Sequence, residues 1–279
     1  MAQVLRLHII AIATAAALCF GWLLTGRTPW LAALACALDW LVVNLANRVA
    51  DIEEDRKNGV AGTDFVARHA RALTAACALL VAASLPALHF TGLTPLRLAF
   101  HALGLAYNYR VLPGRRRFKE TYLWKNASSA ALFVLSCLLY PAALAGWDVS
   151  WARLAWLAAF FFPLEMTYEI IYDLRDVEGD RAQGVRTFPV VHGPRAAWRI
   201  VEALIAASAA ALVAGWLSGA LRVRELLLLA APVQQALLFE LRIKRSVTQR
   251  DCIALTWLGA AQVFSYLLWA WAGLPLGPG

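Results

Sequence analysis

Two acidic clusters stand out in this hydrophobic chain, because each of them directly follows an apolar run. The first occupies residues 47–55 and reads Asn-Arg-Val-Ala-Asp-Ile-Glu-Glu-Asp. The second occupies residues 173–180 and reads Asp-Leu-Arg-Asp-Val-Glu-Gly-Asp. Carboxylates beside a membrane-length helix are costly to keep there and therefore indicate a functional site.

Helical geometry would bring the oxygen ligands of each cluster onto one face. If the preceding helices continue at 100° per residue, the ligands of the first cluster fall within about 80° and those of the second within about 60°. These residues are Asn47, Asp51 and Asp55 in the first cluster and Asp173, Asp176 and Asp180 in the second. Mg²⁺ takes hard oxygen ligands and usually keeps substrate phosphate among them. Two such clusters predict a pair of Mg²⁺ sites facing a polyphosphate.

The elements that must position these clusters are predicted to be membrane-spanning helices. Of the 279 residues, 61% are hydrophobic, against about 45–50% in an ordinary soluble domain. Nine runs have spanning length: 8–26, 28–47, 71–90, 92–109, 125–146, 151–172, 196–219, 223–241 and 252–275. The run 92–109 is the weakest, because His101 and Asn108 interrupt it. No soluble domain fits between the runs, so residues 1–279 are predicted to form one polytopic, all-α domain.

The basic residues predict how this domain is oriented. With nine spans, 21 of the 26 lysines and arginines fall on one side of the membrane. The positive-inside rule places that side and the N-terminus in the cytoplasm, and we expect a prokaryotic inner membrane. A signal peptide is the alternative for the first run, but residues 24–28 lack a small-x-small cleavage pattern, which favours a retained span. The net charge of +8 follows from this topology and does not indicate a nucleic-acid partner.

A basic loop separates the two acidic clusters and lies on the same predicted side. It contains Arg116, Lys119 and Lys125, followed by Asn126. Lysine and arginine can neutralise the phosphate charge that bound Mg²⁺ leaves over. Such a loop can instead serve only topology, near anionic lipids. The acidic clusters on the same face favour a substrate-binding role for these four residues.

Acidic residues also continue from the second cluster into the apolar run 151–172. Glu165 and Glu169 share a helical face with Asp173, so an acidic stripe is predicted to enter the membrane. Asp39 in the run 28–47 is a weaker counterpart. For Glu165 and Asp39, buried pairing with an arginine or the backbone is an equal alternative to a functional role.

The pattern Asn47-x-x-x-Asp51-x-x-x-Asp55 resembles the first signature of the UbiA superfamily of intramembrane prenyltransferases. The segment 173–193 is similar to the second signature and is the more specific of the two. The resemblance covers essentially the whole chain. It departs at Arg48, where many members carry a second Asp, and it lacks the Arg-Pro pair often found after the first motif.

The resemblance implies nine transmembrane helices around a central cavity, with a cap on the cytoplasmic side. Members bind an isoprenyl diphosphate through Mg²⁺ and transfer the prenyl group to an aromatic or other lipophilic acceptor. Helical geometry alone does not choose Asp55 over Glu54, whereas the resemblance does. The residues that it assigns to the metal and diphosphate sites are Asn47, Asp51 and Asp55, and Asp173, Asp176 and Asp180.

In such a reaction, an allylic cation needs a dry, electron-rich surround. Aromatic faces provide one, and Tyr107, Tyr109, Tyr168 and Tyr172 are the candidates. The expected partners are a prenyl diphosphate, a lipophilic acceptor for which an aromatic one is favoured, and the bilayer, with no obligate protein partner.

Two other functions stay open at this level. A UbiA-type terpene cyclase would ionise the same diphosphate but quench the cation internally. A transporter or cation carrier would also contain intramembrane acids, although these acids cluster at one interface. Neither the acceptor nor the prenyl length follows from the sequence. Quinone-ring precursors, chlorophyllide-like macrocycles, glycerol-phosphate lipids and carotenoids are the candidate acceptors.

Overall fold

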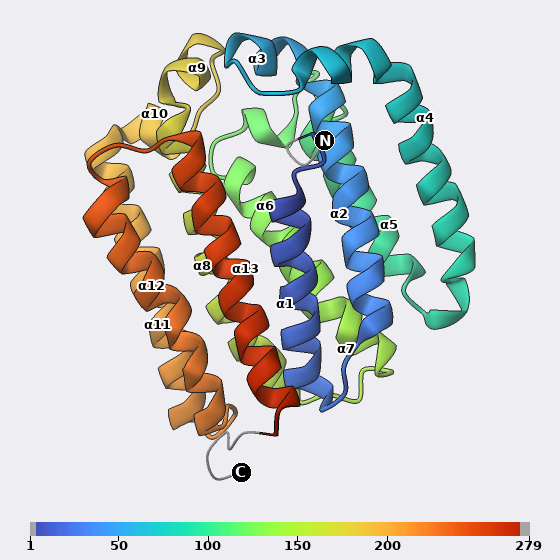
Figure 1. The fold of residues 1–279 in the computed structure, drawn as a ribbon, viewed down its shortest axis with the longest axis vertical. Coiled ribbons are helices and arrows are strands. Elements are labelled where there is room, and N and C mark those ends of the chain that lie inside the picture. The colour runs from blue at the N-terminus through green and yellow to red at the C-terminus, as the bar shows by residue number, and fades with distance from the viewer. Residues whose placement is uncertain (1–3, 274–279) are drawn as a thin grey trace.

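Long helices that run roughly along one axis make up most of the computed structural model, which describes residues 4–273 (Figure 1). The N-terminal residue predicted to be cytoplasmic lies outside that range. Within it, the only β pairing is an isolated bridge between Leu112 and Arg116. The long helices are α1 (Leu7–Thr25), α2 (Trp30–Ala50), α4 (Thr63–Ala87), α5 (Thr94–Asn108), α8 (Trp151–Arg175), α11 (Pro194–Leu217) and α13 (Gln249–Trp271).

Two further rods are built from several helical pieces. The first joins α6 (Trp124–Val134), a π-helical turn (Leu135–Leu139) and α7 (Tyr140–Leu144). The second joins a 3₁₀ segment (Val223–Leu229), α12 (Ala230–Leu238) and a second π-helical turn (Phe239–Ile243). Short 3₁₀ turns also occur at His89–Thr91 and Phe118–Glu120.

Eight helical segments of the described chain are long and apolar enough to cross a membrane. The predicted all-α membrane class is therefore confirmed. The fourth predicted span, 92–109, forms α5, which has 15 residues. Such a helix is about 22 Å long, less than the roughly 30 Å of a hydrocarbon core. The count of nine spans stays a prediction.

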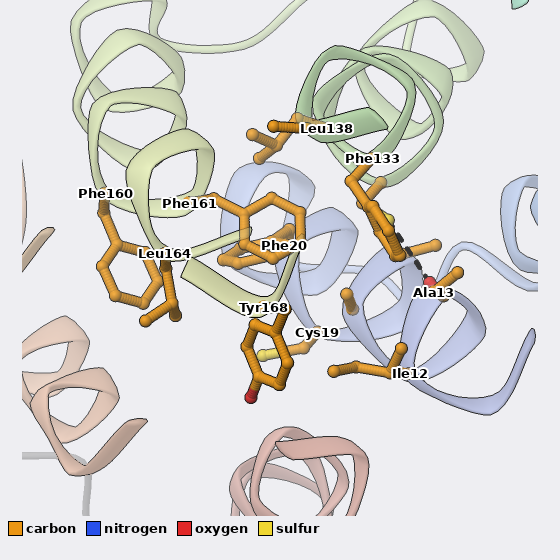
Figure 2. Packing of buried hydrophobic residues seen from close by; sticks show 14 of the residues in the cluster. Ile12, Ala13, Cys19, Phe20, Phe133, Leu138, Phe160, Phe161, Leu164 and Tyr168 are labelled. Carbon is orange, nitrogen blue, oxygen red and sulfur yellow. Dashed lines mark hydrogen bonds between the residues drawn. The ribbon is translucent and has the colours of Figure 1, made fainter. Parts of the chain in front are cut away.

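The long helical segments close into a ring. Each helix packs against the next in the order α1, α2, α5, α6, α8, α11, α12 and α13, and α13 packs back against α1. Helix α4 lies outside this ring, against α2. Small buried residues on α1, such as Ala13 and Ala16, permit close helix packing. Larger rings fill the contact with α8, where the ring centroids of Phe20 and Phe161 lie 4.7 Å apart (Figure 2).

Three short helices, α3 (Ile52–Lys57), α9 (Val177–Ala182) and α10 (Phe188–His192), gather at the end of the molecule where α1 begins (Figure 1). We call these three helices the cap. The C-terminal end of α3 lies close to α9. A Cβ added at Gly179 of α9 would lie only 2.8 Å from the side-chain oxygen of Asn58, the residue that follows α3. The cap therefore brings together the second halves of the two acidic clusters.

Each acidic cluster lies at a break between helices, so the expectation that α2 and α8 continue straight through the clusters is wrong. Asp51 has φ −108° and ψ 18° between α2 and α3, and Asp176 has φ −99° and ψ 12° between α8 and α9. At both breaks the chain turns from the bundle into the cap. The central aspartate of each cluster, Asp51 or Asp176, therefore lies where the helix bundle meets the cap.

Candidate active site

A cavity of about 850 Å³ lies inside the helix ring next to the cap. Its wall contains residues of both acidic clusters. Away from the cap the wall contains apolar side chains, among them Ile12, Trp40, Val43, Leu132 and Phe133. The cavity therefore combines a charged end with an apolar interior.

The first cluster is organised around Asp51, which is buried and accepts hydrogen bonds from three side chains. Asn47 Nδ2 donates to its Oδ2 at 2.7 Å. Lys119 Nζ and Arg117 Nη1 donate to its Oδ1 at 2.6 and 3.0 Å. Lys119 also donates to Glu54 Oε2 at 2.9 Å. Asp51 thus collects amide and cationic donors from two segments that are distant in sequence.

Asp55 belongs to the same cluster but has a partner of its own. Arg48, 1% exposed, donates from Nη1 to Asp55 Oδ2 at 2.5 Å and from Nη2 to the Ala61 carbonyl at 2.9 Å. Burial raises the pKa of Asp55 above its usual value, and the charges of Arg6 and Arg48 oppose that rise. The arginine that departs from the family motif therefore neutralises a carboxylate of that motif.

The second cluster is organised around Lys125. Its Nζ lies 2.7 Å from Asp173 Oδ1 and 3.3 Å from Asp180 Oδ2, and Asn126 Nδ2 donates to Asp173 Oδ2 at 2.9 Å. Burial raises the pKa of Asp180 to about 6, against the charge of Lys125. Asp176 instead pairs with its neighbour Arg175, whose Nε donates to Oδ1 at 2.6 Å.

Most of the residues predicted for the site line this one cavity. They are Asn47, Asp51, Asp55, Tyr107, Lys119, Lys125, Tyr168, Tyr172, Asp173 and Asp176. Asn126 and Asp180 are buried but lie outside the lining. Asn126 donates a hydrogen bond to Asp173, and Asp180 accepts one from Lys125. The structure does not bring Arg116, predicted to bind the substrate, to the cavity. Its side chain is exposed and outside the lining, and its backbone forms the β bridge with Leu112. Arg117, the next residue, contacts Asp51 instead, because the irregular loop turns its side chain inward.

The structure separates Asp39 from the acidic residues of α8. Arg97 Nε donates to Asp39 Oδ2 at 2.9 Å, Tyr140 OH donates to the same atom at 2.8 Å, and His101 Nε2 lies 3.0 Å from Oδ1. Asp39 is therefore a paired structural residue. Glu169, by contrast, lines the cavity and accepts a hydrogen bond from Ser129 Oγ at 2.8 Å.

Sequence reasoning missed five residues as members of the site: Arg48, Glu54, Asn108, Arg117 and Ser129. Asn108 accepts a hydrogen bond from Asn47 Nδ2 at 2.9 Å, and its position in an apolar run was a usable signal. Arg48 was visible as a departure from the motif. The positions of Arg117 and Ser129 depend on long-range packing, so their sequence neighbourhood carried no such signal.

The site suits a metal that is shared with a phosphate ligand. Among the described residues, no three His, Cys, Asp or Glu side chains lie close enough to form a metal cage. Mg²⁺ usually binds through one or two carboxylates, with substrate phosphates and water completing its octahedron. The donor set is made of oxygens, namely carboxylates on both sides of the cavity together with the Asn47 amide. These residues fit Mg²⁺ in company with a diphosphate.

A ring of helices around an acid-lined cavity, capped at one end, defines a polytopic membrane protein with a site inside its helix bundle. The chain matches the UbiA prenyltransferase family over residues 8–268 and belongs to that family. The identification that the two motifs indicated is thus confirmed, and with it the prenyltransferase class of enzyme.

Two solved structures of a UbiA homologue from Archaeoglobus fulgidus share the fold. The one bound to DMAPP and Mg²⁺ has a TM-score of 0.72 at 19% identity, covering 98% of this chain and 99% of that chain. The one bound to GPP and Mg²⁺ has a TM-score of 0.71 at 20% identity, covering 95% and 96%.

A curated relative is similar over a shorter stretch. The digeranylgeranylglyceryl phosphate synthase of Methanopyrus kandleri is 35% identical over 103 residues, which is 37% of this chain and 36% of that protein. The match thus spans little more than a third of the relative's length.

Proposed function

We propose that this protein transfers an isoprenyl group from a prenyl diphosphate to a lipophilic acceptor within the membrane. One observation carries the proposal: carboxylates of two separate motifs, with lysines between them, line the charged end of a cavity whose interior is apolar. A diphosphate with a hydrocarbon tail has the same division into a charged head and an apolar body. The Archaeoglobus homologue, which has this fold, binds DMAPP or GPP with Mg²⁺.

We assign one Mg²⁺ ion to each cluster, two in all. Asn47 and Asp51 would hold the first, and Asp173 and Asp176 the second. Mg²⁺ there would neutralise the diphosphate and make it a better leaving group. Asp55, which is paired with Arg48, and Asp180, which lies outside the cavity lining, would support these ligands without binding the ions themselves.

The residues of the chain have separate roles in the transfer. The allylic C–O bond breaks and its electron pair leaves with the diphosphate, whose charge Lys119, Lys125 and Arg117 stabilise. The acceptor nucleophile then forms the new bond to that carbon and loses its proton, which passes to water as the diphosphate is released. Tyr107 and Tyr168 line the cavity, where their rings can stabilise the developing cation.

For the acceptor we propose a glycerophosphate-type lipid with a free hydroxyl group. The family resemblance implied an aromatic or other lipophilic acceptor, and the name of the Methanopyrus relative describes a glyceryl phosphate that carries two geranylgeranyl groups. Cyclisation stays the runner-up, since it needs the same cavity without an acceptor. Transport is disfavoured, because Asp39, the acidic residue of α2, is paired with Arg97 and is therefore not free to bind a transported ion.

We also propose that residues 1–279 form a single domain of a prokaryotic inner membrane, with the cap and the active site facing the cytoplasm. The basic loop residues Lys119 and Arg117 contact Asp51 at the capped end. The positive-inside rule assigns that end to the cytoplasm.

The test uses purified membranes and radiolabelled prenyl diphosphates of several chain lengths. Binding should require Mg²⁺ or Mn²⁺ and should disappear with EDTA, because the ligands are carboxylates that accept but do not donate hydrogen bonds. Transfer should appear when a mono-prenyl glyceryl phosphate is added. Undiminished binding in EDTA would rule out the metal site, and a cyclic hydrocarbon formed without any acceptor would indicate the cyclase instead.

A further inference from the structure

Two buried polar side chains in the cavity have no partner that the fold provides. Asn44 and Glu165 are each 3% exposed, and both line the cavity. Asn44 Nδ2 has no hydrogen-bond partner. Among residues 4–273, no side chain or backbone group forms a hydrogen bond or ion pair with the Glu165 carboxyl group. Asp39, at a similar level of burial, is paired by three side chains.

The two groups lie at matching depth on different helices. Asn44 is on α2, seven residues before Asp51, and Glu165 is on α8, eight residues before Asp173. At 1.5 Å per residue, they lie about 10 and 12 Å farther from the cap than those aspartates. The cavity wall also contains Ile12, Phe133 and Tyr168, which Figure 2 shows within the buried hydrophobic cluster.

Such an arrangement is costly unless something binds there. Leaving a buried donor or acceptor without a partner costs about 1–3 kcal/mol, and more for a charged group. Buried polar groups without partners are accordingly few in folded proteins. A prenyl tail cannot satisfy them, because hydrocarbon neither donates nor accepts hydrogen bonds.

We propose that Asn44 and Glu165 bind and orient the hydroxyl-bearing part of the acceptor; this inference rests on the proposed prenyl transfer. The nucleophile reaches the allylic carbon on the face that the leaving diphosphate does not occupy. With the diphosphate at the cap, the acceptor hydroxyl lies deeper in the cavity. Glu165 hydrogen-bonds this hydroxyl, and Asn44 Nδ2 donates to its oxygen or to an adjacent ether oxygen.

The position of Glu169 agrees with this assignment. It lies one helical turn closer to the cap than Glu165 and already accepts a hydrogen bond from Ser129. Asn47, one turn closer to the cap than Asn44, is likewise engaged with Asp51 and Asn108. The polar groups next to the diphosphate site are thus satisfied within the protein, whereas the pair one turn deeper is available to a ligand.

The experiment replaces each group by an apolar residue of similar size, as Asn44→Leu and Glu165→Leu. The KM for a mono-prenyl glyceryl phosphate should rise about tenfold in each variant, the equivalent of one hydrogen bond of about 1.4 kcal/mol. The metal-dependent Kd for the prenyl diphosphate should stay within about twofold of the wild-type value. Glu165→Gln should recover part of the loss, and Glu202→Gln on α11, outside this cavity, is the matched control.

A second readout separates binding from structure. The apolar variants should melt at the same temperature as the wild type or higher, because an unpartnered polar group has been removed. An acceptor analogue with a methylated hydroxyl should inhibit the wild type more weakly than the free hydroxyl compound does. Both apolar variants should lose that discrimination.

The possible failures are distinguishable. If the wild type does not bind prenyl diphosphate with Mg²⁺, the proposed function is wrong. If it binds but transfers to neither the glyceryl phosphate nor a phenol probe, the hydroxyl acceptor and this inference are both wrong. If it transfers normally and the variants keep the wild-type acceptor KM, or lose prenyl diphosphate affinity or stability instead, this inference alone is overturned.

Discussion

Replacing Asp51 by Asn tests the first carboxylate cluster while keeping the shape of the side chain. The Asp51 carboxylate accepts hydrogen bonds from Asn47, Arg117 and Lys119. The substitution removes the negative charge and one acceptor oxygen. If Asp51 holds Mg²⁺ against the diphosphate, turnover should fall on the order of 10²-fold or more, as loss of a preorganised charge-stabilising group typically causes.

The effect on stability should be much smaller than the effect on turnover. Breaking a buried ion pair costs about 3–5 kcal/mol when the remaining charge is left uncompensated. Here Arg117 keeps Glu120 at 2.8 Å and Lys119 keeps Glu54 at 2.9 Å. We therefore expect a loss of about 1.5–3 kcal/mol, the range for hydrogen bonds to charged groups.

The assay compares three quantities in detergent or membranes: turnover of labelled prenyl diphosphate, its Kd with Mg²⁺, and the thermal unfolding midpoint. The matched control is Asp64→Asn, an exposed residue in the first turn of α4, which should change none of them appreciably. Turnover within a few-fold of wild type in Asp51→Asn would refute the metal assignment. Equal loss of folding and turnover would show that Asp51 is structural.

Three further predictions concern charge and topology. Because the pKa of Asp180 is raised to about 6 in the folded protein, from about 3.9 in an unfolded chain, the folded state binds the extra proton between these values. Stability should then fall as pH rises from about 4 to 6, and Asp180→Asn should flatten that slope in thermal unfolding measured across this range. Arg48→Leu should destabilise the protein by about 3–5 kcal/mol, because Asp55 would be buried without its partner; adding Asp55→Leu should restore much of the loss, and additive effects would contradict the pairing. Finally, the five native cysteines are buried, so in a background without them, cysteine at Gly114 and at Arg27 should label from opposite sides of the membrane; labelling from one side would refute the topology.

The sequence by itself determined the class of protein and the location of its charged end. In a bilayer the backbone must satisfy its own hydrogen bonds, so long apolar runs become helices almost regardless of their neighbours. The cost of a carboxylate near lipid makes each acidic cluster informative without any knowledge of the fold. For that reason Asp51 and Asp173 were identified from sequence, and the structure places both on one cavity.

Only the tertiary structure decided which groups are partners. Helical periodicity does not extend through the breaks at Asp51 and Asp176 or into the loop that turns Arg117, not Arg116, toward Asp51. It also cannot show which helices become neighbours. Asp39 and Glu165 are both acids within apolar runs, with equal alternatives from sequence. The fold brings Arg97 to one of them from 58 residues away and leaves the other facing a cavity, because pairing depends on long-range packing that no local pattern records.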